Sequence, residues 1–358
     1  MSASSRVTAA EPQRLAARAP RPRVARVLCA LTMTVAAALA AALAPAGLRA
    51  AVSEAPAPAA TPPEVTAEIE VSGERAGPRM WRISQGEHVV WLLGTLDPLP
   101  KRMSWRSLEV ERVLSEAQAV LASNPSVRPS VGPISAVRLY LQWRRTEKLP
   151  ERAHLAAVVP APLYARFEAL KARYDPRDQR IEELRPIIAA LRLYERALAS
   201  SGLTSSNEIE DTVLKLARRH DVRVVRTALK LEDPRGLLDE AQEIPRAAEI
   251  DCLAATVGRL ESDLPNMQAR ARDWALGNVE GLRQLPFPPQ REVCLNAVTS
   301  SPRLRELIAR ATRDWDAALE TALHDNHTTL ALRSMYDLLG EQGLIARLRA
   351  RGYTVEGP

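Results

Sequence analysis

The chain has 358 residues and a formal net charge of +6, and hydrophobic residues make up 46% of it. Seven arginines and one acidic residue lie within residues 1–50, which leaves 42 of the 49 basic and 42 of the 43 acidic residues to positions 51–358. This neutral remainder lacks the basic surface that nucleic-acid binding requires, so we expect no nucleic-acid partner. Its length suffices for one large or two modest domains with a hydrophobic core.

The basic N-terminus has the order of an export signal. Arginines up to Arg26 precede an apolar run from Val27 to Leu43, and small residues with cleavage-site character follow at 44–46 and 48–50. We expect residues 1–50 to be a signal peptide and the protein to be periplasmic or secreted. An uncleaved membrane anchor is the alternative, and membrane contact is expected only through this segment.

The segment after the signal is rich in proline and alanine. This composition is typical of an extended linker, which we place at residues 51–78. The folded domain is expected to occupy residues 79–358.

The first elements of the domain predict a β-hairpin. A short strand at Trp81–Ile83 is followed by a turn centred on Gly86 and by an apolar strand at Val89–Leu93 that ends at Gly94. The second strand is apolar on both faces, so we expect it to lie inside the sheet and to be covered on both sides.

Helical spacing of apolar residues dominates the middle of the chain. The expected helices are Trp105–Ala122, one beginning near Ile134, one through Leu163–Tyr174, one closed by Gly202, and most of Pro234–Ala322. One strand, Val222–Thr227, follows a helix after a tight link, which predicts a crossover and a partly parallel sheet.

The C-terminus returns to strands. Thr328–Leu332 is an expected strand, and a helix that ends at Gly352 precedes a last strand at Tyr353–Val355. We therefore predict an α/β fold in which N- and C-terminal strands form one mixed central sheet, with a large helical middle between them.

Two cysteines remain beyond the signal, Cys252 and Cys294. In an oxidising export compartment they are candidates for one disulfide, whereas two buried thiols on helices are the alternative. The sequence leaves this choice open.

Both ends of the domain resemble the TraB/GumN family, to which the metazoan Tiki metalloproteases are related. The resemblance rests on "WRIS" and "WLLGT" near the start and on "GEQGLIARLRARGYTV" near the end, and it covers Trp81–Val355. It implies a metal-dependent, peptidase-like site built from two G-x-x-H motifs at strand ends and an acidic residue after the first helix. Two imidazoles at one sheet edge would bind a divalent ion, and a carboxylate would serve as a ligand or general base.

This sequence departs from the motifs that the resemblance implies. The first motif reads Gly94-Thr95-Leu96-Asp97, and the second reads Ser334-Met335-Tyr336-Asp337, so aspartate replaces histidine in both. Ser123 or Asn124 occupies the place of the acidic residue, and the family's Arg-Asn pair is half kept as Arg313-Asp314.

Two aspartates in place of two histidines allow three interpretations. In the first, the metal site is lost and the fold survives as a binding protein. In the second, the site takes a hard ion such as Mn²⁺, Mg²⁺ or Ca²⁺ through Asp97 and Asp337. In the third, the two aspartates form a metal-free acid/base pair. The structural alternative for Asp97 is a simple turn, because it precedes Pro98.

We expect an exported, catalytically degenerate relative of metallopeptidases that binds a peptide or envelope component. No cofactor is expected under this reading. The alternative is a hydrolase that uses an oxygen-ligated divalent metal at Asp97 and Asp337. His324 and His327 are a further candidate pair, because they have the spacing of two metal ligands on one helical face. If a metal is bound, we expect one of them to approach Asp337 across a loop. The structural alternative is that a helix C-terminus also favours histidine.

Overall fold

The computed structural model describes residues 77–129, 132–285, 287–339 and 342–358. The expected signal peptide and all but the last two residues of the expected linker lie outside these ranges. The described residues belong to one unit, Glu70–Pro358. None of the helices within them combines the length and the apolar composition needed to span a bilayer.

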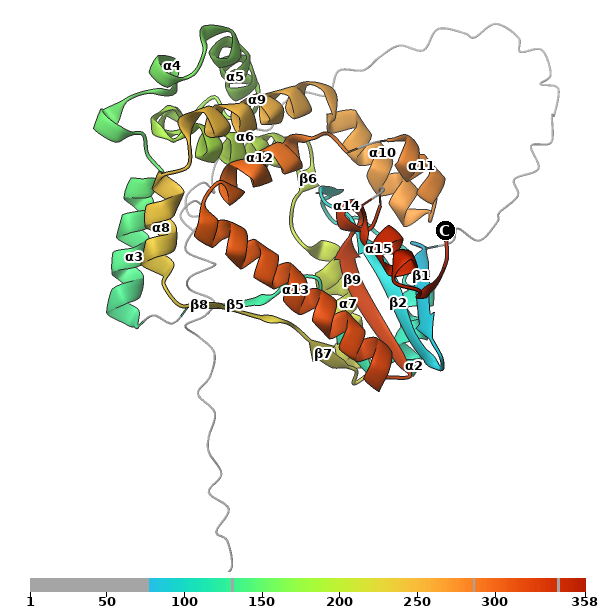
Figure 1. Ribbon diagram of the computed structural model, residues 1–358. Helices are drawn as coiled ribbons and strands as arrows, with labels where there is room; N and C mark the ends of the chain where they lie inside the picture. The colour runs from blue at the N-terminus through green and yellow to red at the C-terminus, as the bar shows by residue number, and fades with distance from the viewer. Residues whose placement is uncertain (1–76, 130–131, 286, 340–341) are drawn as a thin grey trace, which may run out of the picture. The chain divides into compact units, whose positions relative to one another are not determined.

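A six-stranded mixed sheet forms the centre of this unit, in the order β10-β1-β2-β9-β4-β7 (Figure 1). Its strands are β1 (Met80–Gln85), β2 (His88–Thr95), β4 (Ala119–Leu121), β7 (Arg223–Val225), β9 (Thr328–Ser334) and β10 (Thr354–Glu356). β1 is antiparallel to β2 and β10, whereas β2, β9, β4 and β7 are parallel. The prediction that strands from both ends of the chain share one mixed sheet is confirmed.

The N-terminal hairpin forms as predicted. Gly86 has a φ of 60° in its turn, a conformation that glycine adopts without steric cost. β2 lies between β1 and β9, and Val90, Leu92 and Leu93 on it are fully buried, which confirms an interior strand.

The expected helix from Trp105 to Ala122 is too long. The helix α2 spans only Leu108–Glu116, and Ala119–Leu121 is the strand β4, which pairs with β9 and β7. All three β4 residues are buried, because β9 and β7 pair with the two edges of the strand and helices cover the faces of the sheet. A short run that is apolar on every side has no period that distinguishes a strand from a helix.

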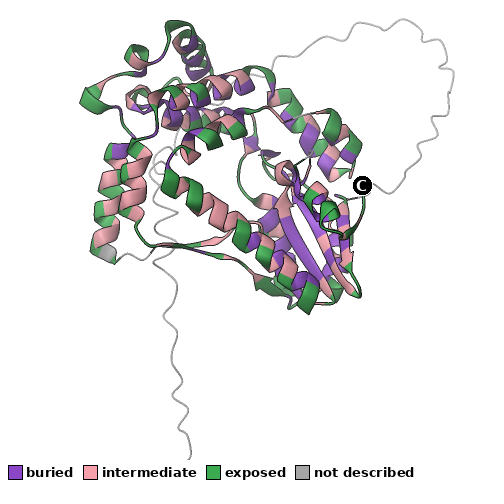
Figure 2. Cartoon of the chain, in the orientation of Figure 1, coloured by how far each residue is buried: buried purple, intermediate pink, exposed green. Residues whose placement is uncertain are grey.

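Helices cover both faces of the sheet. The long helix α13 (Pro302–Asp325) contacts β1, β2 and β9, while α2 and α7 (Glu208–Arg219) contact each other, β9 and β7. Right-handed crossovers place α2 and α7 on one face and α13 on the other. Figure 2 shows the strands as the most continuously buried part of the chain.

A second hydrophobic core lies among helices. Its main elements are α4 (Leu155–Val158), α5 (Ala161–Tyr174), α6 (Pro186–Ser200), α9 (Arg246–Ser262) and α12 (Gln290–Thr299). Phe167, Leu193 and Leu253 are fully buried in it. Cys252 of α9 and Cys294 of α12 form a disulfide with a Cα separation of 4.6 Å, so the two helices are covalently joined.

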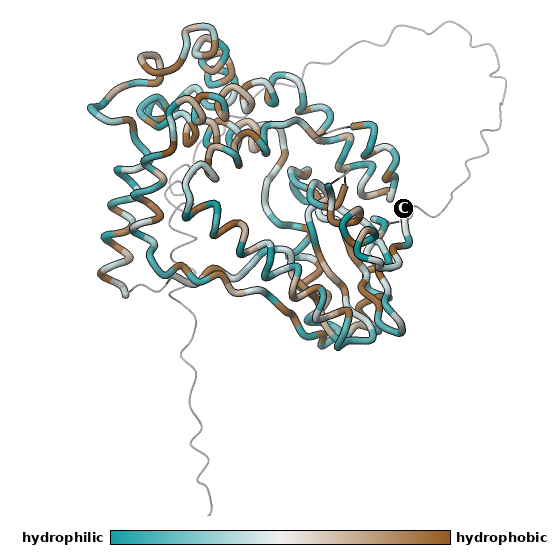
Figure 3. Tube along the Cα trace, viewed as in Figure 1, coloured by the Kyte–Doolittle hydropathy of each residue, from teal (hydrophilic) through white to brown (hydrophobic). Residues whose placement is uncertain are grey.

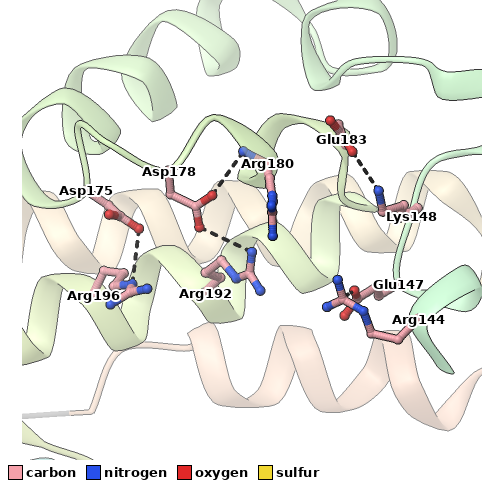
Figure 4. Close-up of polar contacts among 9 residues, drawn as sticks. All are labelled: Arg144, Glu147, Lys148, Asp175, Asp178, Arg180, Glu183, Arg192 and Arg196. Atoms are coloured by element: carbon pink, nitrogen blue, oxygen red, sulfur yellow. Dashed lines mark hydrogen bonds and ion pairs between the residues drawn. The ribbon is translucent and has the colours of Figure 1, made fainter. Parts of the chain in front are cut away.

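Ion pairs fix the segment before α6 onto that helix (Figure 4). Arg192 contacts Asp178 at 3.2 Å, and Arg196, four residues later on the same face, contacts Asp175 at 3.1 Å. The short 3₁₀ helix η2 (Gln179–Glu183) begins here, with Asp178 accepting a hydrogen bond from the backbone of Arg180. Exposed pairs of this kind contribute little stability each, so their role is alignment.

Further helices connect these elements. They are η1 (Pro150–Arg152), α10 (Leu264–Ala275), α11 (Val279–Gln284), α14 (Met335–Leu338) and α15 (Leu344–Ala350). The strands β3 (Leu99–Pro100) and β6 (Leu203–Thr204) pair with each other. Gly202 follows α6 and Gly352 follows α15, both with positive φ, which confirms the predicted helix ends.

Two strands that the sequence did not predict join two predicted helices in an arm. β5 (Ser126–Pro129) pairs in parallel with β8 (Ala228–Leu231), and each strand leads into a helix, α3 (Pro133–Thr146) or α8 (Pro234–Gln242). α3 and α8 lie side by side in Figure 1. We call these four elements the arm.

Candidate functional site

The two altered motifs meet at the carboxyl edge of the sheet. β2 and β9 pair in parallel with Gly94 opposite Arg333 and Thr95 opposite Ser334. The chain leaves β2 toward Asp97, and it leaves β9 through α14, which carries Asp337. The two motifs therefore lie at one edge of the sheet, as the family resemblance implied.

Gly94 is required here by packing. A Cβ atom at this position would lie 2.0 Å from Met335 Sδ and 3.1 Å from a methyl group of Leu338. The carbonyl oxygen of Gly94 accepts a hydrogen bond from Trp274 Nε1 at 2.6 Å, and the Trp274 side chain is buried. The glycine of the first motif therefore serves the close approach of α14 to β2.

A second indole closes the end of β4. Trp315 Nε1 donates to the carbonyl oxygen of Ala122 at 3.0 Å. The guanidinium of Arg333 lies over the Trp315 ring at 4.6 Å from its centroid, a cation–π contact. The strand ends are thus covered by aromatic rings and a guanidinium.

Asp337 is held by two arginines. Arg333 Nε lies 3.3 Å from one of its oxygens, and Arg291 Nη2 lies 3.4 Å from the other. Arg291 comes from α12 and also lies over the Tyr336 ring at 4.8 Å. The carboxylate of the second motif therefore pairs with two guanidiniums and leaves this cluster with a net positive charge.

Asp97 differs from Asp337 in its surroundings. It is exposed to solvent, yet it lies between the buried residues Leu96 and Pro98 and precedes Pro98 in a cis peptide bond. This partial burial raises the pKa of Asp97 from 3.8 to about 6, while the positive charges of Arg259 and Arg291 oppose the shift. Asp97 is thus a carboxyl group that changes charge near neutral pH.

Charged and polar side chains from α9, α10 and α12 form a hydrogen-bonded group near Asp97. Arg259 lies 3.4 Å from Asp263 and donates to Gln290 at 2.9 Å, and Arg270 also pairs with Asp263. Arg259 lies over the ring of Tyr194, whose pKa burial raises to about 12, with Asp97 among the lesser causes. Sequence reasoning missed these residues.

The other candidates from the sequence lie apart from this edge or have structural contacts. Arg313 is exposed on α13 and pairs with Glu306 at 2.6 Å, outside the cleft where it was expected. Asn124 donates to Glu210 at 2.9 Å, so a buried carboxyl group from α7 lies beside the end of β4. Desolvation raises the pKa of Glu210.

The hypothesis that His324 or His327 approaches Asp337 is wrong. His327 precedes β9, so it lies at the amino end of the strand, whereas Asp337 follows its carboxyl end. There the His327 ring stacks on His88 at 5.7 Å, and exposed His324 contacts Asp325. The length of β9 separates these histidines from the second motif.

The donor set at this edge does not fit a divalent metal. Within the described ranges, no group of three or more histidine, cysteine, aspartate or glutamate side chains is arranged to hold a metal ion. Asp337 already accepts from two guanidiniums, and a cation beside Asp97 would face Arg259 and Arg291. Like charges at this range disfavour metal binding.

A cavity of about 1110 Å³ lies beside Asp337. Its wall contains four arginines and three aromatic residues: Arg283, Arg333, Arg347, Arg349, Trp81, Phe287 and Tyr336. Among the described residues of this wall, Asp337 is the one acidic side chain. The cavity is therefore cationic with an aromatic lining.

A family model described as the TraB/PrgY/gumN family matches residues 79–357. No curated protein and no solved structure matches the chain. The family match spans every strand of the central sheet and the whole carboxyl edge.

Proposed function

Because the chain belongs to the TraB/PrgY/gumN family, we propose that it is an exported, catalytically degenerate member that binds a carboxylate-bearing ligand. The ligand class is a peptide or an envelope fragment, held in the arginine-lined cavity beside Asp337. The observation that supports this proposal is the composition of the cavity wall, which contains four guanidiniums and one carboxylate.

The charges favour an anion. Arg333 is already paired with Asp337. Arg347 contacts Asp316 at 3.2 Å, yet 45% of the Arg347 side-chain surface stays exposed. Arg283 pairs with exposed Glu280 at 3.4 Å and contacts a main-chain oxygen of Pro358, and 50% of its side-chain surface stays exposed. Such half-exposed guanidiniums retain donors for a carboxylate, which arginine binds with two parallel hydrogen bonds.

The aromatic residues suit the rest of such a ligand. Tyr336 and Phe287 meet edge to face at 5.9 Å, and both line the cavity. Apolar rings beside a charged group are the usual composition of a small-molecule or peptide pocket.

The alternative function is a hydrolase with an oxygen-ligated metal at Asp97 and Asp337. The pKa of Asp97, raised to about 6, is the observation in its favour, because a carboxyl group that titrates near neutrality suits acid/base chemistry. Against it stand the guanidiniums of Arg291 and Arg333 on Asp337, which a metal would have to displace.

Calorimetric titration with alanyl-alanine tests ligand binding. The proposal expects binding on the order of 1 mM or tighter, and much weaker binding of the C-terminally amidated dipeptide, which lacks the carboxylate. Arg347→Gln removes one charged donor and should weaken binding roughly tenfold. Arg313→Gln is the matched control, because this arginine is exposed on α13 outside the cavity wall.

Equal binding of the dipeptide and its amide, or an equal effect of both arginine variants, would contradict the proposal. Titration with Mn²⁺, Mg²⁺, Ca²⁺ and Zn²⁺ separates the alternative. Binding of a hard ion that is lost in both Asp97→Asn and Asp337→Asn would favour the hydrolase.

The proposal that the protein is exported depends on the signal-like sequence of residues 1–50. N-terminal sequencing of the chain recovered from a periplasmic fraction tests it, since a processed signal leaves a new N-terminus near the small residues at 44–50. Recovery with an intact N-terminus in the membrane fraction would favour the anchor.

A further inference from the structure

Helix α3 of the arm carries an exposed apolar stripe. Ile134, Val137 and Leu141 share one helical face and are 71%, 60% and 52% exposed, and Tyr140 (52%) and Trp143 (40%) continue the apolar surface around the helix. The other large exposed apolar residues in the described ranges are scattered over other elements. Such a concentration on one helix marks an interaction surface rather than chance exposure.

No described segment covers this stripe. α8 packs along another side of α3, where Gln142 donates to Asp239 at 2.6 Å, and α8 itself has no buried residue. Figure 2 shows both helices as mainly intermediate or exposed, and Figure 3 shows apolar turns along α3. The arm therefore has no hydrophobic core of its own beyond the seam between its two helices.

The two helices have opposite charges at their exposed positions. α3 contains no acidic residue, and its exposed Arg138 and Arg145 form no ion pair with any described residue. α8 and its C-cap present the exposed acids Asp239 and Glu243 on one helical face, where exposed Arg235 lies one turn before Asp239. Each arm thus contains both halves of a complementary pair.

We propose that the arm is a homodimer interface, in which the apolar stripe of α3 packs on the α3 helix of a second copy of this chain. A two-fold arrangement buries both stripes against each other. It also places Arg138 and Arg145 of one protomer beside the acidic face of the partner's α8. Self-complementarity of this kind is what an isologous interface requires.

The acids beside the stripe distinguish this partner from a membrane surface. A helix that lies on an anionic bilayer has basic residues around its apolar face. Here the neighbouring helix α8 presents Asp239 and Glu243, with exposed Glu232 just before it, while α3 itself carries Arg138, Arg144 and Arg145. These carboxylates would be repelled by anionic lipid headgroups, whereas they match the partner's arginines.

Sedimentation velocity of the purified full chain tests the proposal. We expect a concentration-dependent dimer that Val137→Glu combined with Leu141→Glu weakens by roughly 100-fold or more, because two charges would enter the centre of the buried stripe. Leu191→Glu is the matched control, since Leu191 is 48% exposed on α6, outside the arm. Far-UV circular dichroism verifies that each variant is folded.

Charge reversal identifies the register of the helices. Arg145→Glu should weaken the dimer, and adding Glu243→Arg should restore part of the loss. A monomeric wild-type chain, or a dimer that the stripe variants leave intact, would overturn the proposal. So would a monomer that floats with phosphatidylglycerol vesicles, which would assign the stripe to a membrane.

Discussion

Replacing Gly94 with alanine tests whether close packing, rather than chemistry, explains the glycine of the first motif. The added methyl would lie 2.0 Å from Met335 Sδ, whereas ordinary contact needs at least about 3.5 Å. One partner must therefore move by about 1.5 Å. Met335 is 2% exposed and Leu338 is fully buried, so neither has free space to enter.

The expected magnitude follows from two opposing contributions. Overpacking in a dense core costs up to about 3 kcal/mol, and an alanine in a strand regains about 0.5–1 kcal/mol over glycine because the unfolded chain has less freedom. The free energy of unfolding should fall by roughly 2 kcal/mol. Since Asp337 lies two residues after Met335, the ligand cavity should also be disturbed.

Gly258→Ala is the matched control with the opposite sign. Gly258 lies inside α9, where an added Cβ would meet only a guanidinium nitrogen of Arg166 at 3.9 Å, an ordinary contact. The same substitution there should stabilise the protein by about 0.5–1 kcal/mol. Urea unfolding of both variants, followed by tryptophan fluorescence and circular dichroism, measures the two changes.

A double-mutant cycle identifies the atom responsible. Met335→Ala alone leaves a cavity and should cost about 2–5 kcal/mol. In that background Gly94→Ala should cost little, because the obstructing side chain is gone. An unchanged cost in the Met335→Ala background, or a stability of Gly94→Ala equal to the wild type, would refute the packing argument.

Two further predictions concern the disulfide and the carboxyl group of the cleft. The disulfide between Cys252 and Cys294 joins residues 42 positions apart in the sequence. Replacing both cysteines by alanine should therefore lower the free energy of unfolding by up to about 4 kcal/mol. Urea unfolding with and without reductant measures this change. Variants whose unfolding midpoint is unchanged would show that the bond does not contribute. The pKa of Asp97 is raised from 3.8 to about 6 in the folded state, so the folded chain binds this proton more tightly and stability should fall as pH rises from about 4 through 6. Asp97→Asn should remove this slope and be more stable than the wild type at pH 7, and parallel pH profiles of the two proteins would contradict the assignment.

Local sequence patterns predicted the elements that carry the two motifs. The apolar run Val89–Leu93 between two glycines predicted an interior strand, and Thr328–Leu332 predicted a second strand, which the structure pairs with the first in parallel. The glycines at 202 and 352 marked helix ends, because a left-handed residue there favours glycine. Ala119–Leu121 was misassigned, since three apolar residues have no period and only pairing with β9 and β7 makes them a strand.

The sequence by itself placed Asp97 and Asp337 shortly after two predicted strands, and the family resemblance implied that both motifs lie at one sheet edge. Only the tertiary structure decided what surrounds them. Arg291 lies 46 positions before Asp337 and belongs to a helix whose pattern says nothing of its partner. A side-chain pair of that separation depends on how helices pack, which no local spacing encodes, and that packing binds Asp337 to two arginines.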